Sequence, residues 1–276
     1  MQRFVSFALV ALLLAGAMSG CTSLFEKEEA KTRNWSASQF YSKASKALAE
    51  GDYETAIKYY EMLEARYPFG KYAMQAQLDV AYAYYRDSEP DAAIAAADRF
   101  IRIHPSDPHV DYAYYLKGLA NFNRSIDFMT RFLPTDLSQR DSGAALESFN
   151  DFAELIRRFP NSQYAADSRK RLIYLRNLIA QQEVHVARYY MRRGAYLAAA
   201  NRCKEVVEKY PRTPAVEQAL ELMVDAYTRL ELKDLAADAQ RVLAYNREQG
   251  NFKQMDKPGD PSIARVVWDY LGLDEN

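Results

Sequence analysis

Four segments of this chain share one spacing, and the spacing constrains the fold more than any other feature. Each segment has a small residue, an aromatic or other apolar residue four positions later, and a proline eight positions after that. The residue before each proline carries a ring. The four segments are Ala56-Tyr60-Pro68, Ala93-Ala97-Pro105, Ser148-Phe152-Pro160 and Ala199-Cys203-Pro211. A pattern that recurs in phase predicts a repeat architecture built from equivalent units.

A second small residue lies upstream of each segment, where a partner helix is expected to cross. Small side chains at such paired positions let two antiparallel helices approach closely, as in the tetratricopeptide pattern A-x3-F…P. The pairs are Ala44 with Ala56, Ala81 with Ala93, Gly118 with Ser148, and Ala187 with Ala199. The sequence therefore predicts an all-α fold, a tetratricopeptide-repeat solenoid of about five helix pairs, in which residues 226–243 form an atypical last unit.

Local signals place the ends of the helices. Ser36 with Gln39 has the spacing of a capping box, and Pro90 suits a first helical turn. Gly51 and Gly194 fall in turns between paired helices, where a positive φ is often required. The predicted helices span residues 36–50, 53–67, 71–87, 90–103, 108–124, 143–159, 163–193, 195–210, 214–230 and 233–249.

The N-terminus has the features of a bacterial lipoprotein signal. Arg3 supplies a positive charge, residues 4–17 form an apolar run, and Cys21 ends a sequence that resembles a lipobox. We expect a signal peptide over 1–20, a diacylglycerol and an N-acyl chain on Cys21, and then a polar linker to residue 35. An ordinary secretory signal is the alternative. Thr22 follows the cysteine, which by resemblance to enterobacterial lipoproteins implies the periplasmic face of the outer membrane, held by lipid in its inner leaflet.

The repeats also divide the rest of the chain. We expect an N-terminal half over 36–122, an insertion in the third unit over 123–142, a C-terminal half over 143–249 and a tail over 250–276. The insertion is apolar, so it either completes the core between repeats or contacts a ligand or partner. The tail carries a short apolar segment, residues 263–271.

Composition and spacing argue against catalysis and against nucleic-acid binding. The net charge is −1, which gives no general attraction for a polyanion. With Cys21 acylated, Cys203 has no disulfide partner and is expected to be a buried small hydrophobe. His104, His109 and His185 lack neighbours at metal-ligand spacing, and the sequence has no Gly-rich phosphate loop or nucleophile elbow. We expect no enzyme activity, no metal and no cofactor beyond the acyl chains.

Aromatic and charged residues mark the candidate binding surfaces. A tyrosine-rich run at 81–85 is echoed at 111–115. Tyrosine suits recognition surfaces, although rings at this spacing also pack between helices. Residues 165–212 hold eleven Lys and Arg against four Asp and Glu, whereas residues 217–276 hold seven against twelve. This segregation indicates either partner-facing electrostatics or two solvated helix faces.

Longer runs resemble a known family. They are Arg66-Tyr67-Pro68-Phe69-Gly70-Lys71-Tyr72, then Tyr84-Tyr85 leading to Asp98-Arg99-Phe100-Ile101-Arg102, then Phe159-Pro160-Asn161-Ser162-Gln163-Tyr164, and finally Arg193-Gly194-Ala195-Tyr196 leading to Asn201-Arg202. The chain is similar in these runs to the BamD family, the ComL-type lipoproteins that form the D subunit of the β-barrel assembly machinery. The resemblance extends from the lipobox to about residue 248 and leaves the tail unmatched.

The resemblance implies a non-catalytic scaffold for assembly of outer-membrane proteins. The implied partners are the central β-barrel subunit with its POTRA domains, bound by the C-terminal repeats, the smaller lipoprotein subunits, and unfolded outer-membrane proteins, received by the N-terminal repeats. The alternatives are another periplasmic tetratricopeptide adaptor, for pilus-secretin or cell-wall machinery, and a lipid-anchored enzyme. The candidate substrate-binding residues are Tyr67, Phe69, Tyr84 and Tyr85, and the candidate partner-binding residues are Arg188, Arg192, Arg193 and Arg202.

Overall fold

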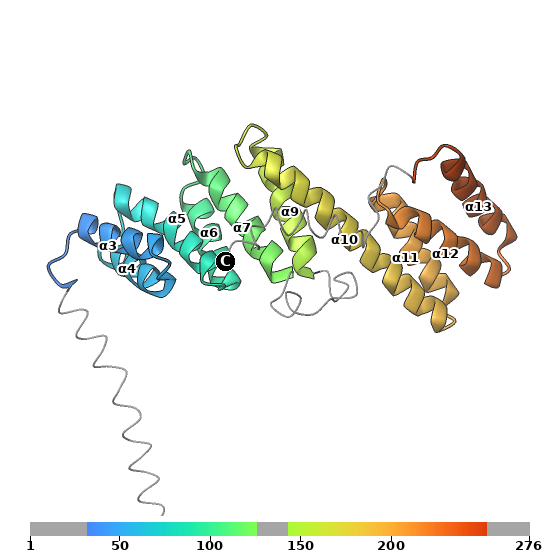
Figure 1. Cartoon of the computed structure of the whole chain (residues 1–276), viewed down its shortest axis with the longest axis horizontal. Helices are drawn as coiled ribbons and strands as arrows, with labels where there is room; N and C mark the ends of the chain where they lie inside the picture. The colour runs from blue at the N-terminus through green and yellow to red at the C-terminus, as the bar shows by residue number, and fades with distance from the viewer. Residues whose placement is uncertain (1–31, 126–142, 253–276) are drawn as a thin grey trace, which may run out of the picture. The chain divides into compact units, whose positions relative to one another are not determined.

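The structure, a computed structural model, describes residues 32–125 and 143–252. These residues form ten α-helices joined by turns, with no strand among them (Figure 1). The chain divides into two compact units, one ending at Ala83 and the other beginning at Tyr84. Cys21, nearly all of the predicted insertion and nearly all of the tail lie outside the described residues.

The first unit contains two whole helices and most of a third. They are α3 (Ala37–Ala49), α4 (Tyr53–Arg66) and α5 (Lys71–Arg86), of which the unit includes all but the last residues. α3 begins at the predicted capping box, in which the Ser36 backbone N–H donates to the Gln39 side chain at 2.8 Å and the Gln39 backbone N–H donates to the Ser36 hydroxyl at 3.4 Å. Both donors would otherwise be unsatisfied at a helix start.

α3 and α4 pack against each other as the repeat pattern predicts. Ala44 on α3 and Ala56 on α4 are both completely buried. Between the helices, Gly51 adopts a φ of 80°, a conformation that costs glycine little because it has no Cβ atom. The small residues and the glycine turn therefore define the first helix pair.

Enlarging a crossing residue is expected to destabilise this pair. Ala56→Leu places three more carbon atoms at a position with no exposed surface, and we expect it to lower the free energy of unfolding by roughly 1–3 kcal/mol. Thermal unfolding followed by circular dichroism measures the change. Ala65→Leu, the same substitution at an exposed position of α4, is the matched control. Equal stability of the two variants would show that the repeat phase is wrong.

The second unit contains the end of α5 and seven further helices. These helices include the remaining helix pairs of the repeat pattern. They are α6 (Pro90–Ile103), α7 (Val110–Ser125), α9 (Gly143–Arg158), α10 (Ala165–Arg192), α11 (Tyr196–Lys209), α12 (Ala215–Arg229) and α13 (Lys233–Glu248).

α7 and α9 form a close pair, although Gly118 and Ser148 are thirty residues apart and the small residues of the other pairs are twelve apart. A Cβ atom built on Gly118 of α7 would lie 2.6 Å from Cε1 of Phe152 on α9, so only glycine fits against this ring. The Ser148 hydroxyl of α9 donates to the Gly118 carbonyl oxygen at 2.9 Å. The predicted crossing of Gly118 with Ser148 is therefore present. Residues 126–142 lie outside the described residues.

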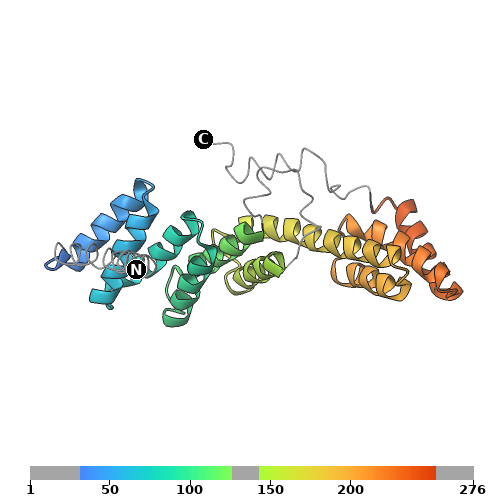
Figure 2. The same ribbon diagram turned by 90° about the horizontal axis from the view of Figure 1, so that it is seen from below.

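α10 is long (Figure 2), and its side chains contribute to two hydrophobic cores, one after the other along the helix. Leu175 and Ile179 pack with Phe152 of α9 in one core. Val184 and Ala187, further along the helix, pack with Cys203 of α11 in the next. Cys203 is buried, as predicted, and burial raises the pKa of its thiol to about 12. The thiol is therefore a packing group and stays protonated at neutral pH.

The ring-proline dipeptides end second helices in one recurring way. Tyr67, His104 and Tyr210 are the C-cap residues of α4, α6 and α11, and each donates its backbone N–H to the carbonyl four residues earlier. The following proline disfavours a further helical residue. All ten helices begin and end within two residues of the predicted bounds, and the predicted all-α tetratricopeptide class is confirmed. Within the described ranges, no helix has the length and apolarity needed to cross a membrane.

Candidate functional site

The predicted substrate residues of the first unit lie side by side in sequence but in different surroundings. The Tyr67 hydroxyl donates to the Trp35 carbonyl oxygen at 2.7 Å, and its ring centroid lies 6.5 Å from that of Phe40. Phe69, two residues later, is 90% exposed. Lys71 follows and places its ammonium group 5.0 Å from the centroid of the Tyr72 ring. Tyr67 thus closes the end of α4, whereas Phe69 presents a ring to solvent next to a cation.

A tyrosine–carboxylate cluster joins all three helices of the first unit. Asp79 on α5 accepts hydrogen bonds from the hydroxyls of Tyr41 on α3 at 2.8 Å and Tyr60 on α4 at 3.4 Å, and from the Gln75 amide at 2.9 Å. The Tyr72 ring lies 5.5 Å from that of Tyr41. Burial raises the pKa of Asp79, and the three donors act in the opposite direction. Burial also raises the pKa of both tyrosines, so both remain donors at neutral pH.

No pattern along the chain predicts this cluster, because its members come from three helices at irregular spacing. Tyr60 belongs to the repeat pattern, but only as its aromatic or apolar position. A half-buried carboxylate with three donors holds the helices in one register. The cluster therefore positions the surface around Tyr41 and Tyr72.

Tyr84 and Tyr85 belong to the second unit and are both half-buried. The equivalent residues on α7, Tyr114 and Tyr115, make two different kinds of contact. Tyr114 is buried against Phe159, 5.7 Å between centroids. The Tyr115 ring stacks on that of Tyr164 at 4.7 Å. The four predicted substrate residues are thus divided between the two units.

The Tyr115 hydroxyl leads into a buried ion pair. It donates to Asp167 at 2.7 Å, and the Arg171 guanidinium donates to the same carboxylate oxygen at 2.6 Å. Arg171 also lies over the Phe122 ring, 4.9 Å from its centroid, and is only 9% exposed. Arg171 is one of the eleven Lys and Arg residues of 165–212, but it faces the core and cannot contribute to an exposed basic surface.

Three of the four predicted partner residues, Arg188, Arg192 and Arg193, lie at the end of α10. Arg192 is the last residue of α10 and Arg193 is its C-cap, and both are exposed. Positive charge is favourable at a helix C-terminus, where carbonyl groups are unsatisfied. Arg188, one turn earlier, donates to the Gln218 side chain of α12 at 2.7 Å. Arg188 therefore also fastens α10 to α12.

Arg202 of α11 is held by a carboxylate from α10. Its guanidinium donates to Glu183 at 3.0 Å, with the arginine side chain 42% exposed and the glutamate side chain 15% exposed. The hydrogen bond to Glu183 is the main cause that raises the pKa of Arg202, and Tyr190 contributes to the same shift. The guanidinium is thus fixed in direction, stays charged and leaves part of its surface open.

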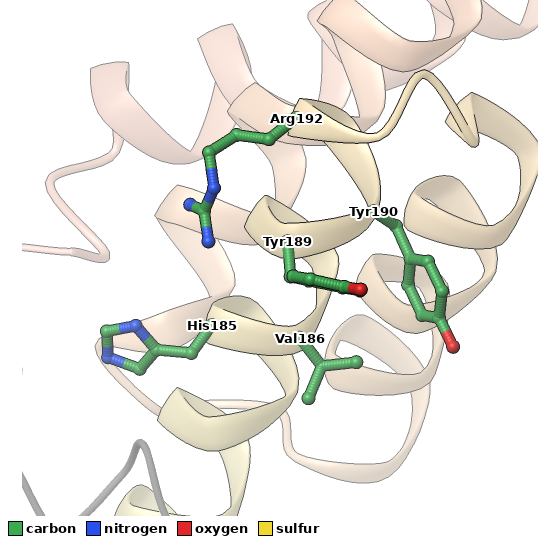
Figure 3. Close-up of a pocket in the computed structure, with 5 residues that line it drawn as sticks. All are labelled: His185, Val186, Tyr189, Tyr190 and Arg192. Carbon is green, nitrogen blue, oxygen red and sulfur yellow. The ribbon is translucent and has the colours of Figure 1, made fainter.

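A hollow of about 670 Å³ lies on the last turns of α10 (Figure 3), and Arg192 is the predicted partner residue that lines it. His185, Tyr189 and Arg192 project from successive turns of the helix, and Val186 and Tyr190 complete the lining. Tyr189 is half exposed, and its ring lies 5.8 Å from that of Tyr190. Tyrosine and arginine are the side chains most often found at the energetic centres of protein interfaces.

The side chains of this surface are suited to recognition of a partner molecule. Guanidinium and phenol groups donate hydrogen bonds to carboxylates and carbonyl oxygens, and the rings offer apolar contact. Sequence reasoning identified the four arginines but missed Tyr189 and Tyr190, which the arginine-rich run itself contains. Among the residues that the structure describes, no group of three or more His, Cys, Asp and Glu side chains is placed to hold a metal ion.

Known proteins match this chain over most of its length. The model of a family described as "YfiO: Outer membrane lipoprotein" matches residues 33–243. A protein named "Outer membrane protein assembly factor BamD" from Neisseria gonorrhoeae is 44% identical over 88% of this chain and 92% of its own length. Proteins of the same name from Xylella fastidiosa (strain 9a5c) and Vibrio cholerae are 36% and 37% identical, over 98% and 76% of this chain and 92% and 87% of theirs.

The alignment with the Xylella protein also corrects one expectation. Because it covers 98% of the chain, it extends into residues 250–276. The motif resemblance ended near residue 248, since it rested on repeat signatures that the tail does not contain. The tail is therefore alignable with a relative.

Proposed function

The chain belongs to the family of outer membrane lipoproteins that includes the assembly factor BamD, and we propose that it is a non-catalytic scaffold of the β-barrel assembly machinery. In this role it binds the central barrel subunit and the smaller lipoprotein subunits, and it receives unfolded outer-membrane proteins. Acyl chains on Cys21 hold it at the periplasmic face of the outer membrane, because two or more buried chains give stable anchoring. Binding energy alone drives each step.

The observation that carries the proposal is the set of partly exposed arginine and tyrosine side chains on the second half of α10 and on α11. Arg202 is oriented by Glu183 and remains partly exposed, while Arg192 and Tyr189, further along α10, offer open side chains. A fixed guanidinium loses little side-chain entropy on binding, so it favours a partner with an acidic surface. The resemblance implies that this partner is the POTRA domain nearest the barrel of the central subunit.

The substrate half of the proposal rests on Phe69. A ring that is 90% exposed gains much from burial against a partner, and Lys71 lies two residues away with its cation over Tyr72. An extended strand that ends in an aromatic residue and a carboxylate supplies both complementary groups. Tyr67, Tyr84 and Tyr85 stay in the proposal as supporting residues, with Tyr67 holding the loop that carries Phe69.

A crosslinking experiment tests the substrate half. With a photoreactive phenylalanine analogue at position 69, we expect a crosslink to a peptide that ends in an aromatic residue and a free carboxylate. The same analogue at Leu197, an exposed apolar residue of α11, is the matched control. Phe69→Ala is expected to weaken peptide binding about tenfold, the loss of roughly 1.4 kcal/mol of ring burial. Equal crosslinking at positions 69 and 197 would remove Phe69 from the site.

A further inference from the structure

Arg188 and Arg202 are held by different chemical groups. Arg188 of α10 is half-buried, and its guanidinium donates to Oε1 of the Gln218 carboxamide on α12 at 2.7 Å. Arg202 of α11 donates instead to the Glu183 carboxylate at 3.0 Å. Glu183 thus compensates the charge of Arg202, whereas the neutral amide of Gln218 leaves the charge of Arg188 uncompensated.

The carboxylates of the neighbouring helices are engaged with other cations. Glu217 and Glu221, which lie on either side of Gln218 along α12, both bind Arg247 of α13. The remaining pairs of α11 and α12 are Glu205 with Lys209, Glu208 with Lys204 and Asp225 with Arg229. Among the residues that the structure describes, Arg188 therefore forms no ion pair.

A buried carboxamide fixes the orientation of Gln218. The Gln181 amide of α10, which is 7% exposed, donates to Oε1 of Gln218 at 3.2 Å, and Nε2 of Gln218 donates in return to Oε1 of Gln181 at 3.5 Å. This reciprocal pair turns the oxygen of Gln218 toward Arg188. The guanidinium is thereby held in one direction, and because it has five N–H groups it can still donate to a further acceptor.

A half-buried guanidinium without a counter-charge favours binding of an external carboxylate. Partial burial penalises an isolated charge, and a carboxylate that reaches Arg188 forms a charge-assisted hydrogen bond without displacing an internal acid. At Arg202, by contrast, an incoming carboxylate competes with Glu183. Arg192 and Arg193 are exposed about one turn beyond Arg188, and their charges add to the attraction for an acidic surface.

We propose that Arg188 binds a carboxylate of an acidic protein partner, and that Gln218 is the positioning residue that orients the guanidinium and keeps it uncompensated. The inference rests on the proposed function, which takes this partner to be the POTRA domains of the central subunit. A glutamate at position 218 would accept the same hydrogen bond but would bind Arg188 in an internal ion pair. The amide at this position therefore determines specificity for an acidic partner.

Gln218→Glu tests the proposal, because the change keeps the shape of the side chain and adds a negative charge. We expect the dissociation constant for purified POTRA domains to rise about tenfold, with no decrease in the midpoint of thermal unfolding. Arg188→Gln should weaken binding to a similar extent. Gln240→Glu, the same change at an exposed position of α13, is the matched control and should retain affinity within about twofold.

A second probe separates this inference from the scaffold role. A hexaglutamate peptide presents carboxylates without a POTRA domain, and hexaglutamine is its uncharged control. We expect the protein to bind hexaglutamate and not hexaglutamine, and Gln218→Glu to weaken this binding. If hexaglutamate binds in this way and the POTRA domains do not bind, the scaffold role is wrong and the carboxylate site at Arg188 is supported.

Four results would overturn the inference. The first is equal affinity of the wild type and Gln218→Glu for the POTRA domains. The second is weaker binding accompanied by a lower unfolding midpoint, because Gln218 would then act through stability alone. The third is failure of both the POTRA domains and hexaglutamate to bind. The fourth is binding of anionic phospholipid vesicles that depends on Gln218 when neither of those probes binds, because the acidic partner would then be a membrane.

Discussion

Arg202→Glu is expected to abolish recovery of the partner complex while the protein stays folded. The substitution removes a guanidinium that Glu183 orients at 3.0 Å and puts a carboxylate beside that glutamate and in front of an acidic partner. Reversal of a close interfacial charge pair costs several kcal/mol. We expect the dissociation constant for the central subunit's POTRA domains to rise at least roughly 30-fold. Titration with the purified POTRA domains measures it.

Lys204→Glu is the matched control for this substitution. Lys204 lies two residues away on the same helix, carries the same charge and pairs with Glu208 in solvent. A surface pair of this kind contributes little to stability or binding, so the control should retain affinity within a few-fold. Equal losses in the two variants would indicate a general charge effect. An unchanged affinity for Arg202→Glu would remove Arg202 from the partner surface.

Gly118→Val is expected to have the largest effect on stability. Even the first added carbon would lie 2.6 Å from the Phe152 ring, which is completely buried and cannot move outward. Separation of α7 from α9 would also break the Ser148–Gly118 hydrogen bond. We expect the free energy of unfolding to fall by about 3 kcal/mol or more, at the upper end of overpacking costs. Denaturant unfolding measures the loss.

Two further variants separate overpacking from a change in helix propensity. Asn123→Val introduces the same side chain at an exposed position of α7 and should change stability by less than roughly 0.5 kcal/mol. Adding Phe152→Leu to Gly118→Val should recover part of the loss, because the smaller side chain leaves room for the valine. If Gly118→Val unfolds like the wild type, the α7–α9 crossing is incorrect.

The contacts that were predicted from the sequence are those that each helix specifies through its own local pattern. Ala44, Ala56 and Gly118 are small because a partner helix crosses there, and this requirement recurs at a fixed place in each repeat. The prolines and the turn at Gly51 are likewise local, since they depend on the conformation of one or two residues. Recurrence of a local requirement is what makes a repeat fold readable from its sequence.

The polar networks could not be predicted from the sequence, because they join residues of separate helices. Lys117 of α7 lies 3.0 Å from Asp98 of α6 and 3.3 Å from Asp151 of α9. Burial acts to lower the pKa of Lys117, but the two carboxylates together outweigh it and raise the pKa. Asp79 similarly collects donors from three helices. Such contacts depend on the register and rotation of separate helices, which no spacing along the chain specifies. The same holds for Arg171, whose sequence neighbours suggested a solvent-facing cation.

Purification of the lipidated protein from membranes in mild detergent tests the scaffold role in β-barrel assembly. The scaffold role predicts that a large β-barrel protein with periplasmic POTRA domains is recovered with it in stoichiometric amount, together with smaller lipoproteins. Mass spectrometry of the eluate identifies them, and Arg202→Glu should lose the barrel protein. Recovery of a secretin, of a cell-wall enzyme or of the chain alone would contradict the scaffold role in β-barrel assembly.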